Sequence, residues 1–140
     1  MTAQEIIEKL ELSPHPEGGY YRQTWMQSGP DRALATCIYF LLTDQQRSHW
    51  HKVDAAELWL FHAGDPLTLW ISETDVGPAE AITLGTNILN GAQGQGLVPK
   101  DWWQSAQTTG AYSLVSCVVS PGFQFDGFEL AAPDFDIPKD

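Results

Sequence analysis

Short apolar runs recur along most of this chain, and turn-forming residues separate them. Stretches such as "SGPD", "HAGDP" and "LNGAQGQG" mark the turns. The runs are rich in β-branched and aromatic residues, which favours strands. Strands are predicted over residues 20–26, 35–42, 47–53, 57–63, 67–72, 80–84, 96–99 and 111–119. Helix-period segments are missing between these runs, so the pattern indicates an all-β sandwich or barrel rather than a parallel sheet with crossover helices.

The two ends of the chain carry different signals. Thr2 and Glu5 fit a capping box, and an apolar stripe follows, so a short helix is predicted from residue 3 to about residue 11. Two prolines and two glycines within residues 13–19 end it in an extended loop. The tail "PDFDIPKD" is acidic and bounded by prolines, which predicts a loosely held strap or a frayed end.

Length and charge narrow the classes of function. The 140 residues suit one domain spanning 1–140. The formal net charge of -11 repels phosphate backbones and anionic lipids, so neither nucleic acid nor a membrane is an expected partner. No signal peptide or membrane-spanning apolar run is evident. Cys37 and Cys117 lie inside apolar stretches, typical of reduced core thiols in a cytoplasmic protein.

Candidate chemistry concentrates in "SHWHKVDAAELWLFHAGDPL", residues 48–67. Alternate side chains of a strand share a face, so His49 and His51 are expected to point the same way. Glu57 follows on the next strand. Two imidazoles and a carboxylate can form a facial set for a divalent first-row metal.

This spacing resembles the first motif of the cupin superfamily, because His49, His51 and Glu57 are followed by Gly64. Three wider blocks, "PHPEGGYYRQTW" (14–25), "HKVDAAELWLFHAGDPL" (51–67) and "YSLVSCVVSPGFQFDGFELA" (112–131), resemble the cupin-5 family, DUF985. The resemblance implies a double-stranded β-helix, or jelly roll, usually paired as a homodimer. It also implies a shape shared with sugar-nucleotide epimerases of the rhamnose pathway and with seed storage globulins.

The chain departs from the general cupin pattern at two places. Five residues separate His51 from Glu57, where three or four are usual. In the second motif, Asp101 stands where glycine is expected and Gln104 takes the place of the last histidine ligand. An amide oxygen is a weaker ligand than imidazole for such metals. The expected cofactor is therefore either none or one divalent metal ion held by His49, His51, Glu57 and Gln104.

The same four residues can instead form a hydrogen-bonded polar patch on the floor of an aromatic pocket for a small molecule. Residues expected to line that pocket are His49, Arg22, Tyr39, Trp59, Trp102, Gln104 and Phe125. The loop and first strand that carry Glu17, Tyr20, Tyr21 and Arg22 are expected to line the pocket mouth. Arg22 can clamp an anionic group of the ligand there or pair with one of the many acidic residues. His15 is expected to face solvent, with the pocket rim as the alternative. His62 lies on the strand face opposite to Glu57 and is expected to be a packed or interface histidine. Phe123 and Phe125 share a face and either close the pocket or plug the barrel end.

Three functions follow as hypotheses. The first is a metal-independent epimerase or isomerase acting on a sugar-like or carbonyl-bearing ligand. In it His51, supported by Glu57, removes a proton next to a carbonyl, and Tyr21 or Tyr39 returns one. The second is a metal-dependent oxygenase, isomerase or lyase that uses His49, His51 and Glu57. The third is a non-catalytic binding or storage-type module.

Overall fold

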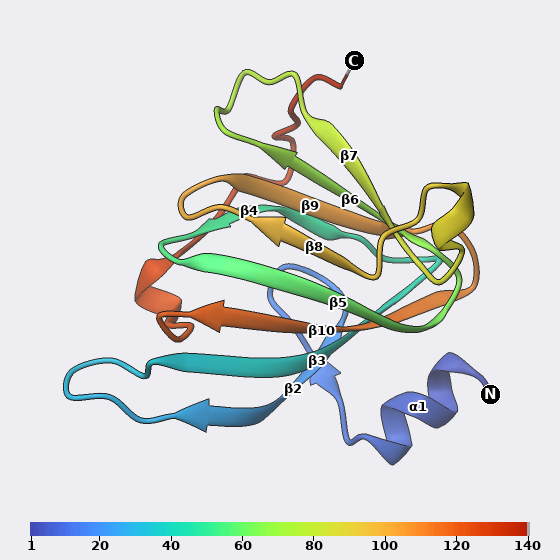
Figure 1. Cartoon of the computed structure of the whole chain (residues 1–140), viewed down its shortest axis with the longest axis horizontal. Coiled ribbons are helices and arrows are strands. Elements are labelled where there is room, and N and C mark those ends of the chain that lie inside the picture. Colours follow the sequence, from blue (N-terminus) through green and yellow to red (C-terminus); the bar gives the residue numbers. More distant parts are fainter. Residues whose placement is uncertain (140) are drawn as a thin grey trace.

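The computed structural model describes residues 1–139, which form two antiparallel sheets and one short helix (Figure 1). The helix is α1 (Ala3–Lys9). The strands are β1 (Ser13–Pro14), β2 (Tyr20–Gln27), β3 (Ala35–Thr43), β4 (Ser48–Val53), β5 (Ala56–Gly64), β6 (Leu67–Ser72), β7 (Glu80–Leu84), β8 (Gln95–Val98), β9 (Trp103–Thr108), β10 (Tyr112–Ser120) and β11 (Phe128–Leu130). Two 3-10 turns, η1 (Ile88–Asn90) and η2 (Phe125–Gly127), lie in the connections.

The two sheets exchange strands in the manner of a jelly roll. One sheet has the order β1-β2-β3-β10-β5-β8, and the other has the order β11-β4-β9-β6-β7. Successive strands such as β3, β4, β5 and β6 therefore alternate between the sheets. The predicted all-β jelly roll with a short N-terminal helix is confirmed.

The N-terminal helix forms as its cap predicts. Thr2 accepts a hydrogen bond from the Glu5 backbone, and Glu5 accepts one from the Thr2 backbone, which completes the capping box. Ile6 is buried against the outer face of the first sheet with Leu41 and Leu114. The helix ends at Lys9, two residues before its predicted end. No helix among residues 1–139 is long and apolar enough to cross a membrane.

One central strand was missing from the prediction. β9 pairs with both β4 and β6, yet its sequence "WQSAQT" shows no β-branched or aromatic enrichment after Trp103. Its interior positions are occupied by Gln104 and Ala106, which are fully buried. A buried amide on a central strand carries no hydrophobic signal, so composition alone does not mark this strand.

The C-terminal segment is held more firmly than its composition predicted. Ile137 is completely buried beside Trp50 and Trp103 on the outer face of the second sheet. The Trp50 indole donates a hydrogen bond of 2.7 Å to Asp136. The segment up to residue 139 is thus a packed strap rather than a frayed end, and residue 140 lies outside the described residues.

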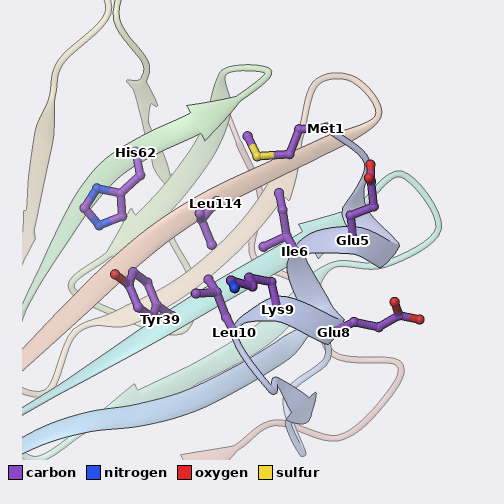
Figure 2. A pocket seen from close by; sticks show the side chains of 9 residues that line it. All are labelled: Met1, Glu5, Ile6, Glu8, Lys9, Leu10, Tyr39, His62 and Leu114. Carbon is purple, nitrogen blue, oxygen red and sulfur yellow. The ribbon is translucent and has the colours of Figure 1, made fainter.

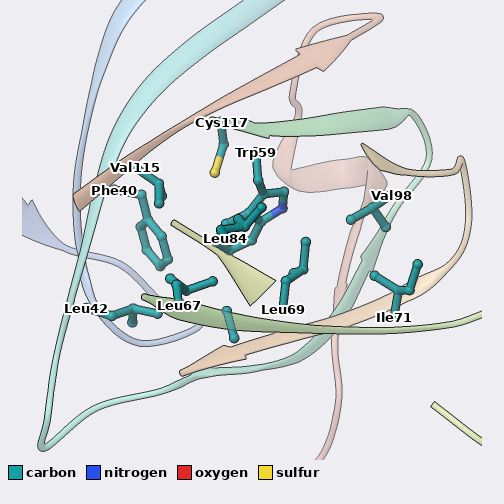
Figure 3. Packing of buried hydrophobic residues seen from close by; sticks show 11 residues of the cluster. Phe40, Leu42, Trp59, Leu67, Leu69, Ile71, Leu84, Val98, Val115 and Cys117 are labelled. Atoms are coloured by element: carbon teal, nitrogen blue, oxygen red, sulfur yellow. The ribbon is translucent and has the colours of Figure 1, made fainter. Parts of the chain in front are cut away.

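The main hydrophobic core lies between the two sheets and draws on both (Figure 3). Phe40, Trp59 and Val115 come from the first sheet, whereas Leu67 and Leu69 come from the second. All five are at most 1% exposed. Burying such side chains stabilises the fold by about 1.5–3 kcal/mol each relative to an exposed position. This packing fills one end of the barrel interior.

Candidate functional site

The other end of the interior contains a cavity of about 240 Å³. Its walls combine acids, imidazoles, small polar groups and aromatic rings. The lining residues are His15, Glu17, Tyr21, Gln23, Thr36, Ile38, His51, Val53, Glu57, Cys117, Val119, Phe123 and Phe125. The cavity is thus lined by both sheets, by the loop after β1 and by the turn after β10.

A bulge in β4 decides which histidine reaches the cavity. Ser48 pairs with Ala106 and His51 with Gln104, so β4 has one residue more than β9 between these pairs. A bulge of this kind breaks the alternation of side chains. Ser48 and His51 are consequently both buried, while His49 turns away and its Nε2 lies 2.8 Å from the Ala132 carbonyl oxygen.

The His51 ring is fixed in one tautomer. Its Nδ1 lies 2.8 Å from the His49 carbonyl oxygen, which can only accept, so Nδ1 carries the proton. Nε2 therefore keeps a lone pair, and it lies 3.5 Å from Oε1 of Glu17. The side chain is 2% exposed. His51 is a buried neutral imidazole with its basic nitrogen directed toward a carboxyl group.

The loop after β1 brings Glu17 and His15 to the cavity. Gly18 and Gly19 both have positive φ, and a Cβ on Gly18 would collide with the Arg47 backbone. This tight turn directs Glu17 inward, where the Ser48 hydroxyl donates to its Oε2. The Glu17 backbone N–H donates to Nδ1 of His15, so that nitrogen is an acceptor.

Glu57 is held by a chain of buried hydrogen bonds. The Trp59 indole N–H, which can only donate, lies 2.8 Å from Oε1 of Gln104 and fixes the amide orientation. The Gln104 amide nitrogen then donates to Oε1 of Glu57 at 2.9 Å. These contacts hold the carboxyl group at the cavity wall.

Burial favours the uncharged forms of the titratable groups, although Glu57 is partly ionised near neutral pH. Desolvation raises the pKa of Glu17 to about 8 and that of Glu57 to about 7, although His51 and the Gln104 hydrogen bond oppose the change at Glu57. Desolvation also lowers the pKa of His15 to about 4, and it lowers the pKa of His51 against the attraction of Glu57. The cavity therefore holds two weak acids and two neutral bases near neutral pH.

Four of the residues predicted for the site line the cavity. These are His51, Glu57, Tyr21 and Phe125. Tyr21 comes from β2 of the first sheet and His51 from β4 of the second, so they approach from opposite walls. Phe125 is 54% exposed, which places it at the mouth of the cavity rather than inside a plug.

The other predicted residues lie elsewhere. His49 is excluded by the bulge. Arg22 is exposed, and its Nη1 donates to the Leu10 carbonyl oxygen and lies 3.4 Å from Oε2 of Glu11. It therefore contacts the end of α1 rather than a ligand. Trp59 is buried in the core. Trp102 lines a separate surface hollow near Ser72 and Pro78. Gln104 lies behind Glu57 as its hydrogen-bond partner.

Tyr39 belongs to the outer face of the first sheet. With His62 and α1 it lines an open groove of about 790 Å³ (Figure 2). His62 is 2.6 Å from the Ser116 hydroxyl there, on the strand face opposite to Glu57, as the alternation predicts. This groove is shallow and mostly apolar, and it contains none of the buried acids.

Two important residues were underestimated from the sequence. His15 was expected to face solvent but is 9% exposed, with its ring 4.5 Å from that of Tyr21. Glu17 was expected only at the pocket mouth but contacts both histidines inside it. The pair of glycines after Glu17 was the available signal, because such a turn can reverse the loop into the interior.

The predicted metal ligands are not brought together. His49 points away, and the amide oxygen of Gln104 already accepts the Trp59 hydrogen bond. Among residues 1–139, no group of three or more His, Cys, Asp or Glu side chains is arranged to hold a metal ion. The donor set of this site therefore does not match the predicted metal centre.

The comparisons with known proteins agree with this architecture. A family model described as Cupin_5, cupin superfamily (DUF985), matches residues 4–131. The chain belongs to this family. Asp101, at the position where the cupin motif has glycine, has φ +66°, a left-handed conformation that aspartate tolerates better than most residues. No match was found among curated proteins.

Solved structures include two relatives of similar size. A protein from Shewanella oneidensis is 40% identical, with a TM-score of 0.89, covering 94% of this chain and 85% of its own. A protein from Leishmania major is 33% identical, with a TM-score of 0.87 and coverages of 94% and 88%. Oxalate decarboxylase from Bacillus subtilis shares the fold at 15% identity and a TM-score of 0.64, but the match covers only 29% of that chain.

Proposed function

We propose that this Cupin_5 protein binds a small carbonyl-bearing metabolite in the cavity and epimerises or isomerises it by acid–base chemistry without a metal. The observation that supports this most directly is the state of His51. It is buried and neutral, and its hydrogen bond to the His49 carbonyl leaves Nε2 as a base within the cavity.

In the proposed reaction, His51 Nε2 removes the proton from the carbon next to the ligand carbonyl. The electron pair of the broken C–H bond moves onto the carbonyl oxygen to give an enolate. Glu57 stabilises the imidazolium that forms, because the two groups interact electrostatically. The Tyr21 phenol then returns a proton to the carbon from the opposite wall, and the enolate electrons re-form the carbonyl. His51 finally passes its proton to the tyrosinate through solvent.

Deuterium exchange tests this chemistry without knowledge of the natural substrate. Small ketoses and hydroxyaldehydes would be incubated with the protein in D₂O, and loss of the α-proton signal would be followed by NMR. We expect catalysed exchange in at least one compound, and we expect His51→Ala to abolish it while the melting temperature stays within a few degrees. His62→Ala is the matched control, because His62 lies on the outer face, and should leave exchange intact. Exchange that persists in His51→Ala would remove His51 from the mechanism.

We also propose a homodimer in the cytoplasm. Trp25, Met26 and Leu34 are about half exposed on the hairpin of β2 and β3, and a second copy would cover them. Cys37 and Cys117 are free thiols, as a reducing compartment would keep them. Analytical ultracentrifugation should give twice the chain mass, and a mass of one chain would contradict the dimer. Fractionation of the source cells would test the location.

A further inference from the structure

The cavity has two carboxyl groups and no permanent counter-charge, because His15 and His51, which lie within 3.5 Å of Glu17, are kept neutral by burial. Glu17 and Glu57 both line it, each less than 10% exposed, and none of the lining residues within the described chain is lysine or arginine. The Arg32 guanidinium is paired outside the cavity, since it lies 2.7 Å from Asp54. Buried carboxyl groups normally have a cationic partner or stay protonated.

Aromatic rings stand beside these acids. Phe123 and Phe125 meet edge to face with ring centroids 5.0 Å apart, and both line the cavity with Tyr21. Aromatic faces attract organic cations, and this attraction adds to that of a nearby carboxylate. A pocket with two acids and three rings combines both attractions.

We propose that the cavity recognises a small organic cation, an ammonium or amidinium compound, whose charge pairs with Glu17 while Phe123, Phe125 and Tyr21 contact its carbon skeleton. This inference rests on the proposed function and names its substrate class: the carbonyl-bearing ligand carries a positive charge. Glu57 remains the partner of His51, and its negative field favours the same ligand.

The charges of the protein favour this class over the alternatives. An anionic ligand would meet two acids and a chain of net charge -11. A neutral ligand would leave Glu17 protonated and would gain no charge-assisted hydrogen bond from it. A cation lets Glu17 release its proton to solvent and form a charge-assisted hydrogen bond, which is about twice as strong as a neutral one. The raised pKa of Glu17 fits a site that lacks its partner until a ligand arrives.

The volume restricts the size of the ligand. At about 240 Å³ the cavity is smaller than most drug-sized pockets, which begin near 300 Å³. A compound with a few carbon atoms and one cationic group fits this space. Thr36 and Gln23 offer further hydrogen bonds for its hydroxyl or carbonyl group.

Three probes of equal size and different charge test the proposal. Ethanolamine, ethylene glycol and glycolate would each be titrated into EDTA-treated protein at about pH 8, close to the pKa of Glu17. Methyl resonances of Ile38, Val53 and Val119 report on the cavity, because all three line it. We expect saturable shifts with ethanolamine, binding at least about tenfold weaker with ethylene glycol, and none with glycolate.

Glu17→Gln should weaken ethanolamine binding at least about tenfold, whereas Glu80→Gln, a control at an exposed position of β7, should not change it. If the variant fails to fold, the comparison of probes on the unaltered protein still decides the charge class. If ethylene glycol or glycolate bound as tightly as ethanolamine or more tightly, the proposed cationic ligand would be overturned. The cavity would remain a binding site for small molecules. No shift with any probe at about 100 mM would overturn both this inference and the proposed function.

Discussion

The two ends of the barrel interior are built from the same strands but differ in content. Along β3, Phe40 and Leu42 project into the filled end, whereas Thr36 and Ile38 line the cavity. Along β5, Trp59 belongs to the filled end and Glu57 to the cavity. On the paired strands β3 and β10, Phe40 lies opposite Val115 and Thr36 lies opposite Val119. The two pairs are therefore toward opposite ends of these strands.

This difference separates stability from chemistry. Large apolar side chains that meet between the sheets remove water and stabilise the fold. Small and polar side chains leave a space whose low dielectric changes the pKa of every acid and base around it. The hydrogen bond from Trp59 to Gln104 joins the two ends, because it connects the packed core to the Glu57 carboxyl group through one amide.

The largest expected effect concerns packing at the filled end. Leu69→Ala removes a fully buried side chain and should lower the free energy of unfolding by about 2–5 kcal/mol. Ile38→Ala removes a side chain that is only partly buried and should lower it by less, about 1–2 kcal/mol. Urea denaturation measures both. Leu97→Ala, at a position 55% exposed, is the control and should change it by less than about 0.5 kcal/mol. Equal losses for Leu69 and Ile38 would contradict the contrast between the two ends.

The connection between the ends gives the next effect. Glu57→Ala leaves the Gln104 amide without its acceptor and should lower the free energy of unfolding by about 1–3 kcal/mol. Glu57→Gln keeps an oxygen acceptor and should cost less than about 1 kcal/mol. Chemical denaturation of both variants at pH 6, where burial keeps the Glu57 carboxyl largely protonated, measures the difference. An equally large loss in Glu57→Gln would show that the Gln104 hydrogen bond does not account for the lost stability.

The acids of the cavity predict how stability depends on pH. The pKa of Glu17 is raised in the folded protein, so the folded state binds more protons than the unfolded chain between its ordinary pKa and about 8. The contribution of the protonated Glu17 carboxyl to the free energy of unfolding is complete at low pH and is lost as the pH rises toward about 8. Between pH 7 and 8 the free energy of unfolding should fall by about 1 kcal/mol, and Glu17→Gln should flatten the fall. Differential scanning calorimetry across this range checks it. A stability that rises over the same range would contradict a buried, protonated Glu17.

His15 gives a smaller effect of opposite sign at lower pH. Its pKa is lowered to about 4, so the folded state binds fewer protons than the unfolded chain between about pH 4 and its ordinary value. That contribution grows as the pH rises through this window and opposes the one from Glu17. His15→Gln should therefore steepen the decline in stability with pH between about 5 and 6.5. The same calorimetric series, with His62→Gln as the control, measures it.

Metal removal should have the smallest effect. We expect EDTA to change the melting temperature by no more than about 1 °C. The reason is that His49 points away from His51 and the Gln104 amide oxygen already accepts the Trp59 hydrogen bond. Elemental mass spectrometry of untagged protein should find well under one equivalent of any transition metal. One equivalent that disappears in His51→Ala would instead support the metal-dependent alternative.

Strand periodicity predicted the sheets and the inward face of β5 from residues alone, because Glu57 and Trp59 obey simple alternation. It misplaced His49, since a bulge depends on the pairing between β4 and β9 and leaves no mark in composition. It also gave no reason to bring the loop residue His15 into the interior. Contacts between distant segments, such as Ser48 with Glu17, form only once both sheets are assembled.

The bulge in β4 also affects how function is transferred between relatives. A sequence alignment matches His49 to the first histidine of the cupin motif. In the structure, however, the inward-facing neighbour of His51 on β4 is Ser48, whose hydroxyl donates a hydrogen bond to Glu17. Two family members with identical motifs can therefore present different atoms to their ligands if their strands pair in different registers. Among such proteins, the residues that form a site depend more on how the strands pair than on which residues the motif contains.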